Sequence, residues 1–387
     1  MPENQFNTAS AALKERLRRA VLDAGFSAAG FARLGPPNHA ACLETWLQAG
    51  YHGKMAWMAR DPAGRMDPQR LFPQARTLLV AAARFESRFA PTLPDQGAFA
   101  AYALRPDYHK ILKQRLQTVA AEILGREPAV RIFVDGGPLL EKPLGVVAGL
   151  GWQGHHSLLV SRRLGCAFLL AEMLLPVELP EDHPDSDHCG TCRRCLESCP
   201  TNAFPAPKIL DATRCLSYWT IEHRGWLPPE MRWAMGNRLF GCDDCLRVCP
   251  WNRFGQVTGI LPLRHDLLNR PLLYWAEITE EAFSAIFRET PVKRLGWPAF
   301  LRNVCVALGN WGDGAAFPAL RRLAGHTSPL VRGHAAWGLG RLLPRYPEIG
   351  SFLDEAAATE EVAEVRTELQ AARSMPNAFP ATDTRSG

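Results

Sequence analysis

The chain of 387 residues lacks a hydrophobic segment that is long enough to cross a membrane. Its longest uncharged run, residues 143–161, is interrupted by several glycines, two histidines and a glutamine, so it is too polar for a bilayer interior. No apolar export region follows the arginine pair Arg18 and Arg19, and a twin-arginine signal is therefore not expected. We expect a cytoplasmic protein with reduced thiols and no membrane partner.

The chain also carries little charge. Only 21% of its residues are charged, and 44 basic side chains against 39 acidic ones leave a net charge of +5. This composition excludes a mostly disordered chain and a coiled coil. The small positive excess permits an anionic partner without requiring one. With 47% hydrophobic residues, the chain is long enough for about two or three domains that bury a core.

Cysteine is present, but not at the density of a small secreted disulfide scaffold. Eight of the eleven cysteines lie in one stretch, as two runs that each end in Cys-x3-Cys-Pro with one cysteine between them. The first run is Cys189, Cys192, Cys195 and Cys199, the second is Cys242, Cys245 and Cys249, and Cys215 lies between them. The other three cysteines, Cys42, Cys166 and Cys305, have apolar neighbours in the sequence, and we expect them to be buried.

The first run has the spacing of bacterial two-cluster ferredoxins, in which the fourth cysteine ligates the other cluster. The second run lacks one ligand, which Cys215 can supply. The spacing therefore predicts two [4Fe–4S] clusters, one held by Cys189, Cys192, Cys195 and Cys249 and the other by Cys199, Cys215, Cys242 and Cys245. Two zinc sites are the alternative. Zinc ribbons do not need the Cys-x3-Cys-Pro ending, so we favour iron and sulfide.

Three domains and a tail follow from the pattern along the chain. Residues 1–7 are expected to form a floppy tail. Helical spacing is present at 10–22, 38–49, 107–124 and 139–148, strand patterns at 78–83, 130–134, 157–160 and 167–174, and a short apolar run at 28–32. Together they predict an α/β domain over 1–180. Residues 181–260 form the two-cluster, ferredoxin-like α+β module. In 261–373, residues 301–309 are echoed at 331–340 with a helix at 315–324 between them, which predicts α-helical HEAT-like repeats. Residues 374–387 are rich in Pro, Thr and Ser and are expected to be disordered.

Asp135 follows the predicted strand at 130–134, at the carboxyl end where active sites of α/β folds tend to lie. Burial there would raise the pKa of its carboxyl and keep it protonated, as a general acid requires. The alternative is that Asp135 caps the helix that starts near Pro138. The pattern Gly149-x-Gly151-x-x-Gly154 matches a dinucleotide fingerprint only weakly, because no strand precedes it, and we interpret it as a loop of close backbone approach.

Five segments resemble the epoxyqueuosine reductase family, in order and over about residues 10–370: YALRPDYHK at 102–110, VDGGP at 134–138, GLGWQG at 149–154, CLSYWTIE at 215–222 and NRLFGCDDC at 237–245. The resemblance implies a cobalamin-dependent oxidoreductase with two [4Fe–4S] clusters. Such an enzyme reduces epoxyqueuosine to queuosine at the wobble position of tRNA, the last step of queuosine biosynthesis. It implies a cobalamin-binding α/β domain followed by the two-cluster module and the helical repeat. We further expect an external low-potential electron donor of the ferredoxin or flavodoxin type, and a monomer.

The same resemblance assigns roles to individual residues. Asp135 matches the proton donor of the family, while Asp107, Tyr108 and His109 line the substrate cavity. The residues expected to contact the corrinoid are Tyr102, Asp135, Gly154, His155, Ser217, Trp219, Gly241 and Asp243. At positions 155–156 this chain has His-His where most members have Lys-Asn. Read locally, the start of the helix at 107 would be an ordinary first turn with Asp107 near its cap, and Trp219 would be a core residue.

The basic residues of the helical region are candidates for binding the tRNA backbone. They are Arg288, Lys293, Arg294, Arg302, Arg321, Arg322 and Arg332, with the aromatic residues Trp297 and Phe300 among them. We expect Lys293, Arg294 and Arg302 to contact tRNA, the alternative being a solvated helix face. Two other functions stay open: a corrinoid enzyme similar to reductive dehalogenases, and a non-catalytic iron–sulfur electron carrier with a docking repeat.

Overall fold

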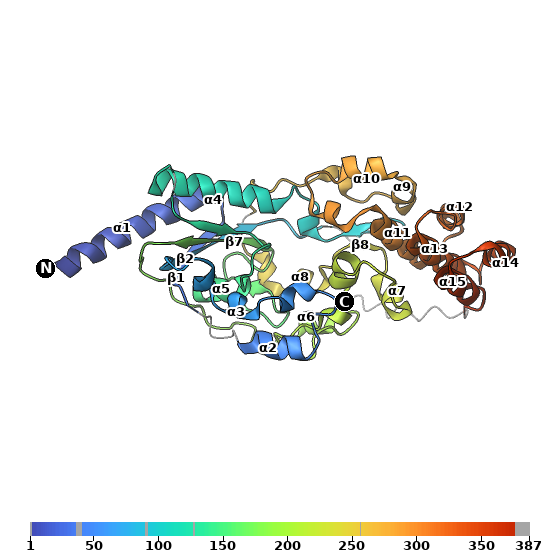
Figure 1. The fold of residues 1–387 in the computed structure, drawn as a ribbon, viewed down its shortest axis with the longest axis horizontal. Helices are drawn as coiled ribbons and strands as arrows, with labels where there is room; N and C mark the ends of the chain where they lie inside the picture. Colours follow the sequence, from blue (N-terminus) through green and yellow to red (C-terminus); the bar gives the residue numbers. More distant parts are fainter. Residues whose placement is uncertain (1, 36–40, 90–91, 127, 256, 376–387) are drawn as a thin grey trace.

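A four-stranded sheet forms the centre of the first part of the chain (Figure 1). The computed structural model describes residues 2–35, 41–89, 92–126, 128–255 and 257–375. The strands are β1 (Ala28–Arg33), β2 (Thr77–Arg84), β7 (Phe168–Leu175) and β4 (Arg131–Phe133), in the order β1-β2-β7-β4. Every neighbouring pair is antiparallel. The strand positions agree with the sequence patterns. Those patterns predicted no strand direction, because periodicity does not encode how strands are connected.

Helices cover both faces of this sheet. On one face lie α1 (Pro2–Asp23) and α4 (Tyr108–Leu124), and on the other lies α5 (Glu141–Val147). Alternate residues of β7 separate the two cores: Ala171 and Met173 face α1 and α4, whereas Leu170 and Leu174 face α5. The expectation of a floppy tail over residues 1–7 was wrong for residues 2–7, since α1 already starts at Pro2, a residue that the first turn of a helix tolerates.

The remaining elements of the first 180 residues are short. They are α2 (Ala41–Gln48), α3 (Pro62–Met66), β3 (Ala98–Phe99), β5 (Trp152–Gln153) and β6 (Leu159–Val160). Strand β6 pairs with β5 in a two-stranded sheet. The part of the predicted helix 38–49 before residue 41 lies outside the described residues.

The cysteine-rich segment joins the sheet domain to the rest of the molecule. Its elements are α6 (Arg194–Glu197), η5 (Tyr218–Glu222), α7 (Pro229–Met235), β8 (Arg238–Phe240) and α8 (Asp244–Arg247). Strand β8, just before the second cysteine run, pairs in parallel with β3 of the first domain. Gly241 follows β8 with a φ of +77°, and a Cβ there would lie 2.5 Å from the Cβ of Ala100. The segment is thus packed directly against residues 98–100.

Stacked helices form the C-terminal part of the molecule, at the end opposite the free end of α1 (Figure 1). They are α9 (Leu272–Glu277), α10 (Glu280–Ile286), α11 (Trp297–Trp311), α12 (Phe317–Leu323), α13 (Pro329–Leu342), α14 (Ile349–Thr359) and α15 (Ala363–Arg373). The two echoed sequences lie in α11 and α13, which pack together. A Cβ on Gly309 would lie 2.8 Å from the Cα of Gly338, so glycine at position 309 permits this close contact. Of the tail predicted over 374–387, residues 376–387 lie outside the described residues.

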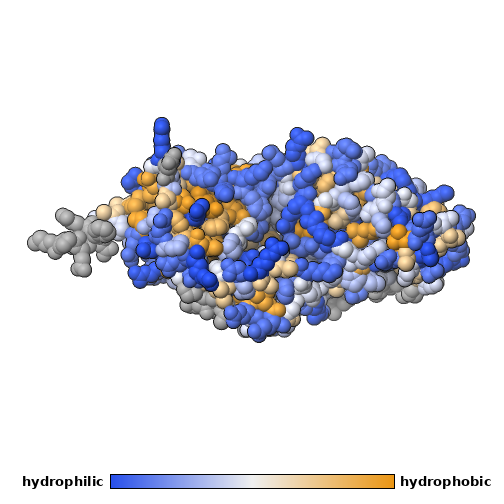
Figure 2. Space-filling view, viewed as in Figure 1, coloured by the Kyte–Doolittle hydropathy of each residue, from blue (hydrophilic) through white to orange (hydrophobic). Residues whose placement is uncertain are grey.

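The surface is mostly hydrophilic on the face that Figure 2 shows, with a larger hydrophobic area over the sheet end of the molecule. Large exposed hydrophobic side chains occur singly on separate elements, for example Leu22, Trp57 and Phe254. Among the residues that the structure describes, no helix combines the length and the hydropathy that a membrane crossing needs.

Candidate functional site

Asp135 lies on the loop after β4, with its side chain against Tyr108 and His109 at the start of α4. These three residues are called the Asp135 recess. Its backbone has the left-handed φ of +54°, an uncommon conformation for a non-glycine residue. The hydroxyl of Tyr108 donates a short hydrogen bond to its Oδ2, and the Nε2 of His109 lies 3.5 Å from the same oxygen. The side chain of Asp135 is 55% exposed, so solvent reaches it from the open side. The three residues that the resemblance had grouped are therefore in contact.

The start of α4 orients His109. Asp107 is the N-cap residue, and its Oδ1 accepts a hydrogen bond from the His109 amide at 3.1 Å. The same Oδ1 lies 2.7 Å from His109 Nδ1, which directs the opposite ring nitrogen toward Asp135. The tyrosine and histidine rings stack with centroids 4.2 Å apart. Asp135 itself caps no helix, because the N-cap residue of α5 is Leu140, so the capping alternative was wrong.

The electrostatics of Asp135 differ from our expectation. Burial raises its pKa, but hydrogen bonds from His109 and Tyr108, together with the charges of His109 and Arg294, lower it to about 2. The expectation that burial would keep this carboxyl protonated was therefore wrong. Burial also lowers the pKa of His109, yet hydrogen bonds to Asp135 and Asp107 outweigh this effect and raise it. Both shifts favour the state in which His109 is protonated and Asp135 is ionised.

Tyr102 connects this recess to the cysteine-rich segment. Its ring lies 6.1 Å from the ring of Tyr108 and 6.3 Å from that of Phe240, the last residue of β8. Burial raises the pKa of Tyr102, and the positive charge of Arg294 acts in the opposite direction. Arg294, at the edge of the helical region, forms a short ion pair with Glu222 of η5. Residues from three parts of the chain thus meet around Tyr102.

The structure brings the cysteines together in two groups. In the first, burial and the neighbouring thiols of Cys189, Cys249 and Cys192 raise the pKa of Cys195 to about 11. Crowded thiols repel each other's ionised forms, so a cation or a cluster that takes up thiolates would remove this penalty. The Nε1 of Trp152 lies 3.4 Å from the Sγ of Cys189 and points a donor at this group.

The second group contains the remaining predicted ligands. Burial raises the pKa of Cys245, and the thiols of Cys242, Cys215 and Cys199 raise it further. The amide of Ala203 donates to the Sγ of Cys199 at 3.2 Å. Two sets of four thiols with N–H donors directed at sulfur fit two iron–sulfur clusters. The membership of each set follows the exchanged pattern of the two runs, and the ligand assignment itself remains a prediction.

The other three cysteines are not among the predicted ligands, although the thiol of Cys166 lies within 4.8 Å of that of Cys249. Cys166 and Cys305 are buried as expected, whereas Cys42 is exposed and that expectation was wrong. Cys42 is the second residue of α2, at a position where the helix turns its side chain to solvent.

The residues predicted to contact a corrinoid fall into separate places. Ser217 and Asp243 adjoin the second cysteine group: Ser217 Oγ accepts from the Cys242 amide at 3.0 Å, and Asp243 Oδ2 accepts from the Ala101 amide at 2.6 Å. Burial raises the pKa of Asp243 to about 6. Trp219 is half-buried, and its Nε1 donates to the Thr213 carbonyl at 2.8 Å, so it also fills the core, as its local sequence suggested.

Gly241 and Asp243 line a cavity of about 240 Å³ between residues 97–100 and the second cysteine run. Gly154 and His155 lie elsewhere. His155 Nδ1 is 2.9 Å from the Cys192 carbonyl, and Gly154 is in the tight β5–β6 turn. The structure therefore places these two residues beside the first cysteine group.

Two of the residues expected to face tRNA are internal. Arg302 is 0% exposed, and its guanidinium donates to the carbonyls of Trp219, His223 and Gly225 and to Asn303 Oδ1. The expected contact of Arg302 with tRNA was wrong, because every face of this guanidinium is occupied by the protein. Phe300 is also 0% exposed and belongs to the core of the helical region.

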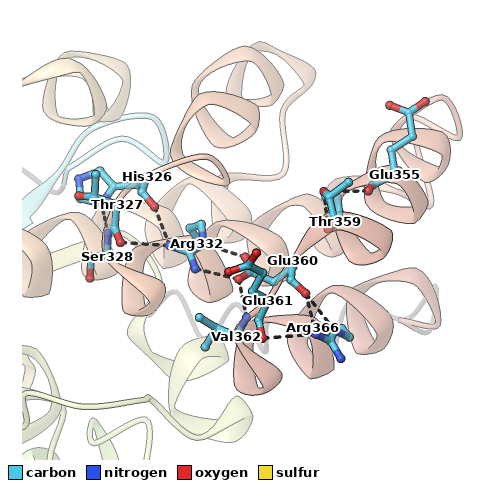
Figure 3. Close-up of polar contacts among 11 residues, drawn as sticks. His326, Thr327, Ser328, Arg332, Glu355, Thr359, Glu360, Glu361, Val362 and Arg366 are labelled. Carbon is cyan, nitrogen blue, oxygen red and sulfur yellow. Dashed lines mark hydrogen bonds and ion pairs between the residues drawn. The ribbon is translucent and has the colours of Figure 1, made fainter.

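Arg332 is also committed to the protein (Figure 3). Its Nε and Nη2 atoms bind the carboxylate of Glu360 at 2.7 and 2.8 Å, and its Nη1 donates to the His326 carbonyl at 2.9 Å. This bidentate pair neutralises the charge that a phosphate would need. Lys293 and Arg294 remain exposed, although Arg294 pairs with Glu222 and Lys293 donates to Ser284 Oγ at 2.5 Å. The charge of Arg294 also acts on Asp135.

The sequence analysis did not identify two residues near Asp135. Glu141 Oε1 accepts a hydrogen bond from the Asp135 amide at 2.5 Å. Behind it, Glu172 is fully buried in β7. The sequence contained a signal for Glu172, because it is the one charged residue in the apolar run FLLAEMLL. A carboxylate in a buried strand lowers stability unless it is paired or protonated, so its presence there indicates a function.

Comparisons with known proteins agree with this arrangement. Residues 65–136 match the family described as epoxyqueuosine reductase QueG, residues 188–252 match a 4Fe-4S double cluster binding domain, and residues 297–373 match HEAT repeats. The predictions of a two-cluster module and of HEAT-like repeats are thereby confirmed.

Relatives with the same function cover most of the chain. The epoxyqueuosine reductase of Pseudomonas aeruginosa is 42% identical over 330 residues, which is 82% of this chain and 91% of that protein. That of Escherichia coli is 39% identical over 350 residues, or 86% of this chain and 90% of that protein.

Solved structures give the same result. An epoxyqueuosine reductase crystallised with an epoxyqueuosine-modified tRNA-Tyr stem loop has a TM-score of 0.83 and 28% identity, covering 94% of this chain and 98% of that one. The Bacillus subtilis enzyme, with its catalytic loop swung out of the active site, has a TM-score of 0.82 and 26% identity with the same coverage. Together with the contacts around Asp135 and the two cysteine groups, these matches show that the chain belongs to the epoxyqueuosine reductase family.

Proposed function

We propose that this protein reduces epoxyqueuosine to queuosine in tRNA. The observation that carries the proposal is the junction at Tyr102, where a proton-holding recess adjoins a module that can carry electrons. The amide of Ala101, next to Tyr102, donates to Asp243 of the second cysteine run at 2.6 Å. Neither a bare electron carrier nor a protein without redox centres needs both parts side by side.

The reaction requires two electrons and two protons. Both C–O bonds of the epoxide are broken, a carbon–carbon double bond forms, and the oxygen leaves as water. Two iron–sulfur clusters can pass on electrons one at a time, and we propose that an external low-potential donor of the ferredoxin or flavodoxin type supplies them. We propose that residues 181–260 carry both clusters.

Cobalamin is the proposed partner of the clusters. When bound, it supplies a strongly reducing cobalt centre for the cleavage of the C–O bond. Gly241 and Asp243 line the cavity beside the second cysteine group, and Ser217 accepts a hydrogen bond from the Cys242 amide there. We propose that these residues hold it together with Tyr102 and Trp219. The positions of Gly154 and His155 support contact with the first cysteine group more directly than contact with a corrinoid.

The protons are handled by the Asp135 recess. Asp135 remains our candidate for the group that protonates the departing oxygen, because its carboxylate is open to solvent on one side and bound by Tyr108 and His109 on the other. Its low pKa means that it must receive the proton during the reaction, and His109, at 3.5 Å, is the nearest source. Asp107 acts as a positioning residue, because it holds the ring of His109.

The substrate side is formed by exposed basic residues near the recess. One related epoxyqueuosine reductase was crystallised with a tRNA stem loop that carries epoxyqueuosine. We propose that Lys293 and Arg294 contact the RNA backbone of such a loop, that the protein acts as a monomer, and that it works in the cytoplasm with its tRNA.

Complementation tests the proposal in cells. A bacterial strain that lacks its own epoxyqueuosine reductase accumulates epoxyqueuosine in tRNA, and expression of this chain should restore queuosine when cobalamin is supplied. The variant Cys245→Ser should fail to do so. If the wild-type chain is expressed in folded form with cobalamin present and epoxyqueuosine persists, the proposal is wrong.

A further inference from the structure

The pair Glu141 and Glu172 is a buried arrangement that the reaction as described above does not use. Glu172 lies in the central strand β7, opposite Val80 of β2 and Phe133 of β4, and is 0% exposed. Its side chain points to the same face as Leu170 and Leu174, into the apolar core below α5. Burying an isolated carboxylate in such a place is strongly unfavourable unless the group is neutral or paired.

Within the described residues, neither carboxylate oxygen of Glu172 has a donor in hydrogen-bonding geometry. Its polar neighbour is the carboxyl of Glu141, the first residue of α5. Two carboxylates have no hydrogen to share, so the contact becomes a hydrogen bond only when one of them carries a proton. Burial and the charge of Glu141 raise the pKa of Glu172. Burial and the charge of Asp135 raise that of Glu141 to about 7.

Glu141 connects the pair to the catalytic loop. Its Oε1 accepts the hydrogen bond of the Asp135 amide at 2.5 Å, and Asp135 holds a positive φ of +54° that needs support from its surroundings. The charged groups that face the pair are Asp135 and Lys142, and His109 faces Asp135 from α4. The partners of Glu172 on β2 and β4 are apolar.

We propose that Glu141 and Glu172 share one proton and so form a latch that keeps the Asp135 loop in the site. The proton holds Glu141 against Glu172, and Glu141 in turn holds the Asp135 backbone. When the proton is lost, the two carboxylates repel each other, Glu141 moves away and the loop is released. Glu141 and Glu172 are positioning residues, and the inference rests on the proposed role of Asp135.

Hydrogen exchange of the loop tests the latch without turnover. In the full chain purified anaerobically with its clusters, amides of residues 134–140 are followed by mass spectrometry between about pH 6 and pH 8.5, after correction for the intrinsic pH dependence of exchange. We expect protection in the wild type to fall about tenfold over this range, because the shared proton is lost near neutrality.

In Glu172→Gln, the amide replaces the shared proton with a permanent N–H donor, so protection should become independent of pH. Glu141→Gln should behave in the same way, because its amide can donate to Glu172 while its oxygen still accepts from Asp135. The exposed Glu178→Gln serves as the matched control and should behave as the wild type. Equal pH dependence in wild type and Glu172→Gln would overturn the latch.

Activity distinguishes the latch from the proposed function. With epoxyqueuosine-containing tRNA, the alkaline fall of kcat should move to higher pH in Glu172→Gln, with KM changed less than twofold. If Glu172→Gln does not fold, Glu141→Gln takes its place in the hydrogen-exchange and activity measurements, with the same expected results. If the wild type is inactive but the protection of its loop depends on pH, only the proposed function is contradicted. If the wild type is active but the protection of its loop does not depend on pH, only the latch is contradicted.

Discussion

The Nε2 atom of His109 lies 3.5 Å from Oδ2 of Asp135 and, by this contact, makes Asp135 a stronger acid than its surroundings would otherwise allow. The catalytic loop and the first turn of α4 are 26 residues apart in sequence, counted from 109 to 135, and they form one proton-holding unit in space. Several properties of the protein should depend on this contact and on the groups around it.

Replacing His109 should change the acidity of Asp135. In His109→Gln, the charge of the imidazolium is lost, so the pKa of Asp135 should rise from about 2 toward the usual range of aspartate. Because the folded state lowers this pKa, the contribution of Asp135 to stability is present above the unfolded pKa and is lost as the pH falls toward 2. The variant should lose less stability in acid. Titration of the carboxyl groups followed by NMR measures the pKa of Asp135. The variant of an exposed histidine, His183→Gln, is the control. An unchanged pKa of Asp135 in His109→Gln would contradict the account.

Replacing a predicted cluster ligand should remove one cluster and leave the other. Cys215→Ser removes a thiolate from the second group, so iron and sulfide should fall to about half of the wild-type content while the first group keeps its cluster. Exposed Cys42→Ser should retain full iron. Iron analysis and electron paramagnetic resonance of the reduced protein report both outcomes. Zinc in place of iron in the anaerobically purified wild type would refute the cluster assignment.

Arg302 should be required for stability and not for RNA affinity. Arg302→Gln leaves buried carbonyls of Trp219, His223 and Gly225 without their donors, at roughly 1–3 kcal/mol for each unsatisfied group. We expect urea unfolding at a clearly lower midpoint with an unchanged slope. Exposed Arg321→Gln should shift stability by less than about 0.5 kcal/mol. A variant of normal stability that binds tRNA poorly would show that Arg302 reaches the RNA.

Lys293 should contribute to tRNA binding through charge. If its ammonium neutralises one phosphate, Lys293→Gln should weaken binding and reduce the slope of log K against log salt by about 0.7–0.9. Arg19→Gln, on α1 at the far end of the molecule, is the matched loss of one positive charge and should leave the slope unchanged. Binding isotherms of the tRNA at several salt concentrations give both slopes. Equal slopes for the two variants would remove Lys293 from the RNA surface.

Local patterns predicted what local physics determines. The helix at 107–124 was predictable because its apolar spacing and its cap at Asp107 lie within the helix itself. The grouping of cysteines was predictable because the exchanged fourth ligand is encoded in the spacing of the two runs. The HEAT-like pair of helices was predictable because the echo at 301–309 and 331–340 is visible in the sequence itself.

Features that depend on distant parts of the chain were not predictable. The burial of Arg302 depends on carbonyls at the end of η5, about 80 residues earlier in sequence. The low pKa of Asp135 depends on His109, and the sign of that effect could not be read from the strand that precedes Asp135. The antiparallel order of the sheet depends on connections that leave no mark in the periodicity of each strand.

The most direct measurement of the central claim is nucleoside analysis of tRNA that carries epoxyqueuosine, incubated anaerobically with the protein, cobalamin and a strong reductant. We predict that the modified nucleoside becomes lighter by one oxygen atom and coelutes with queuosine. Turnover should depend on added cobalamin and fall by on the order of 10²–10⁴-fold in Asp135→Asn. Persistence of epoxyqueuosine with protein that carries both clusters and binds cobalamin would contradict the account.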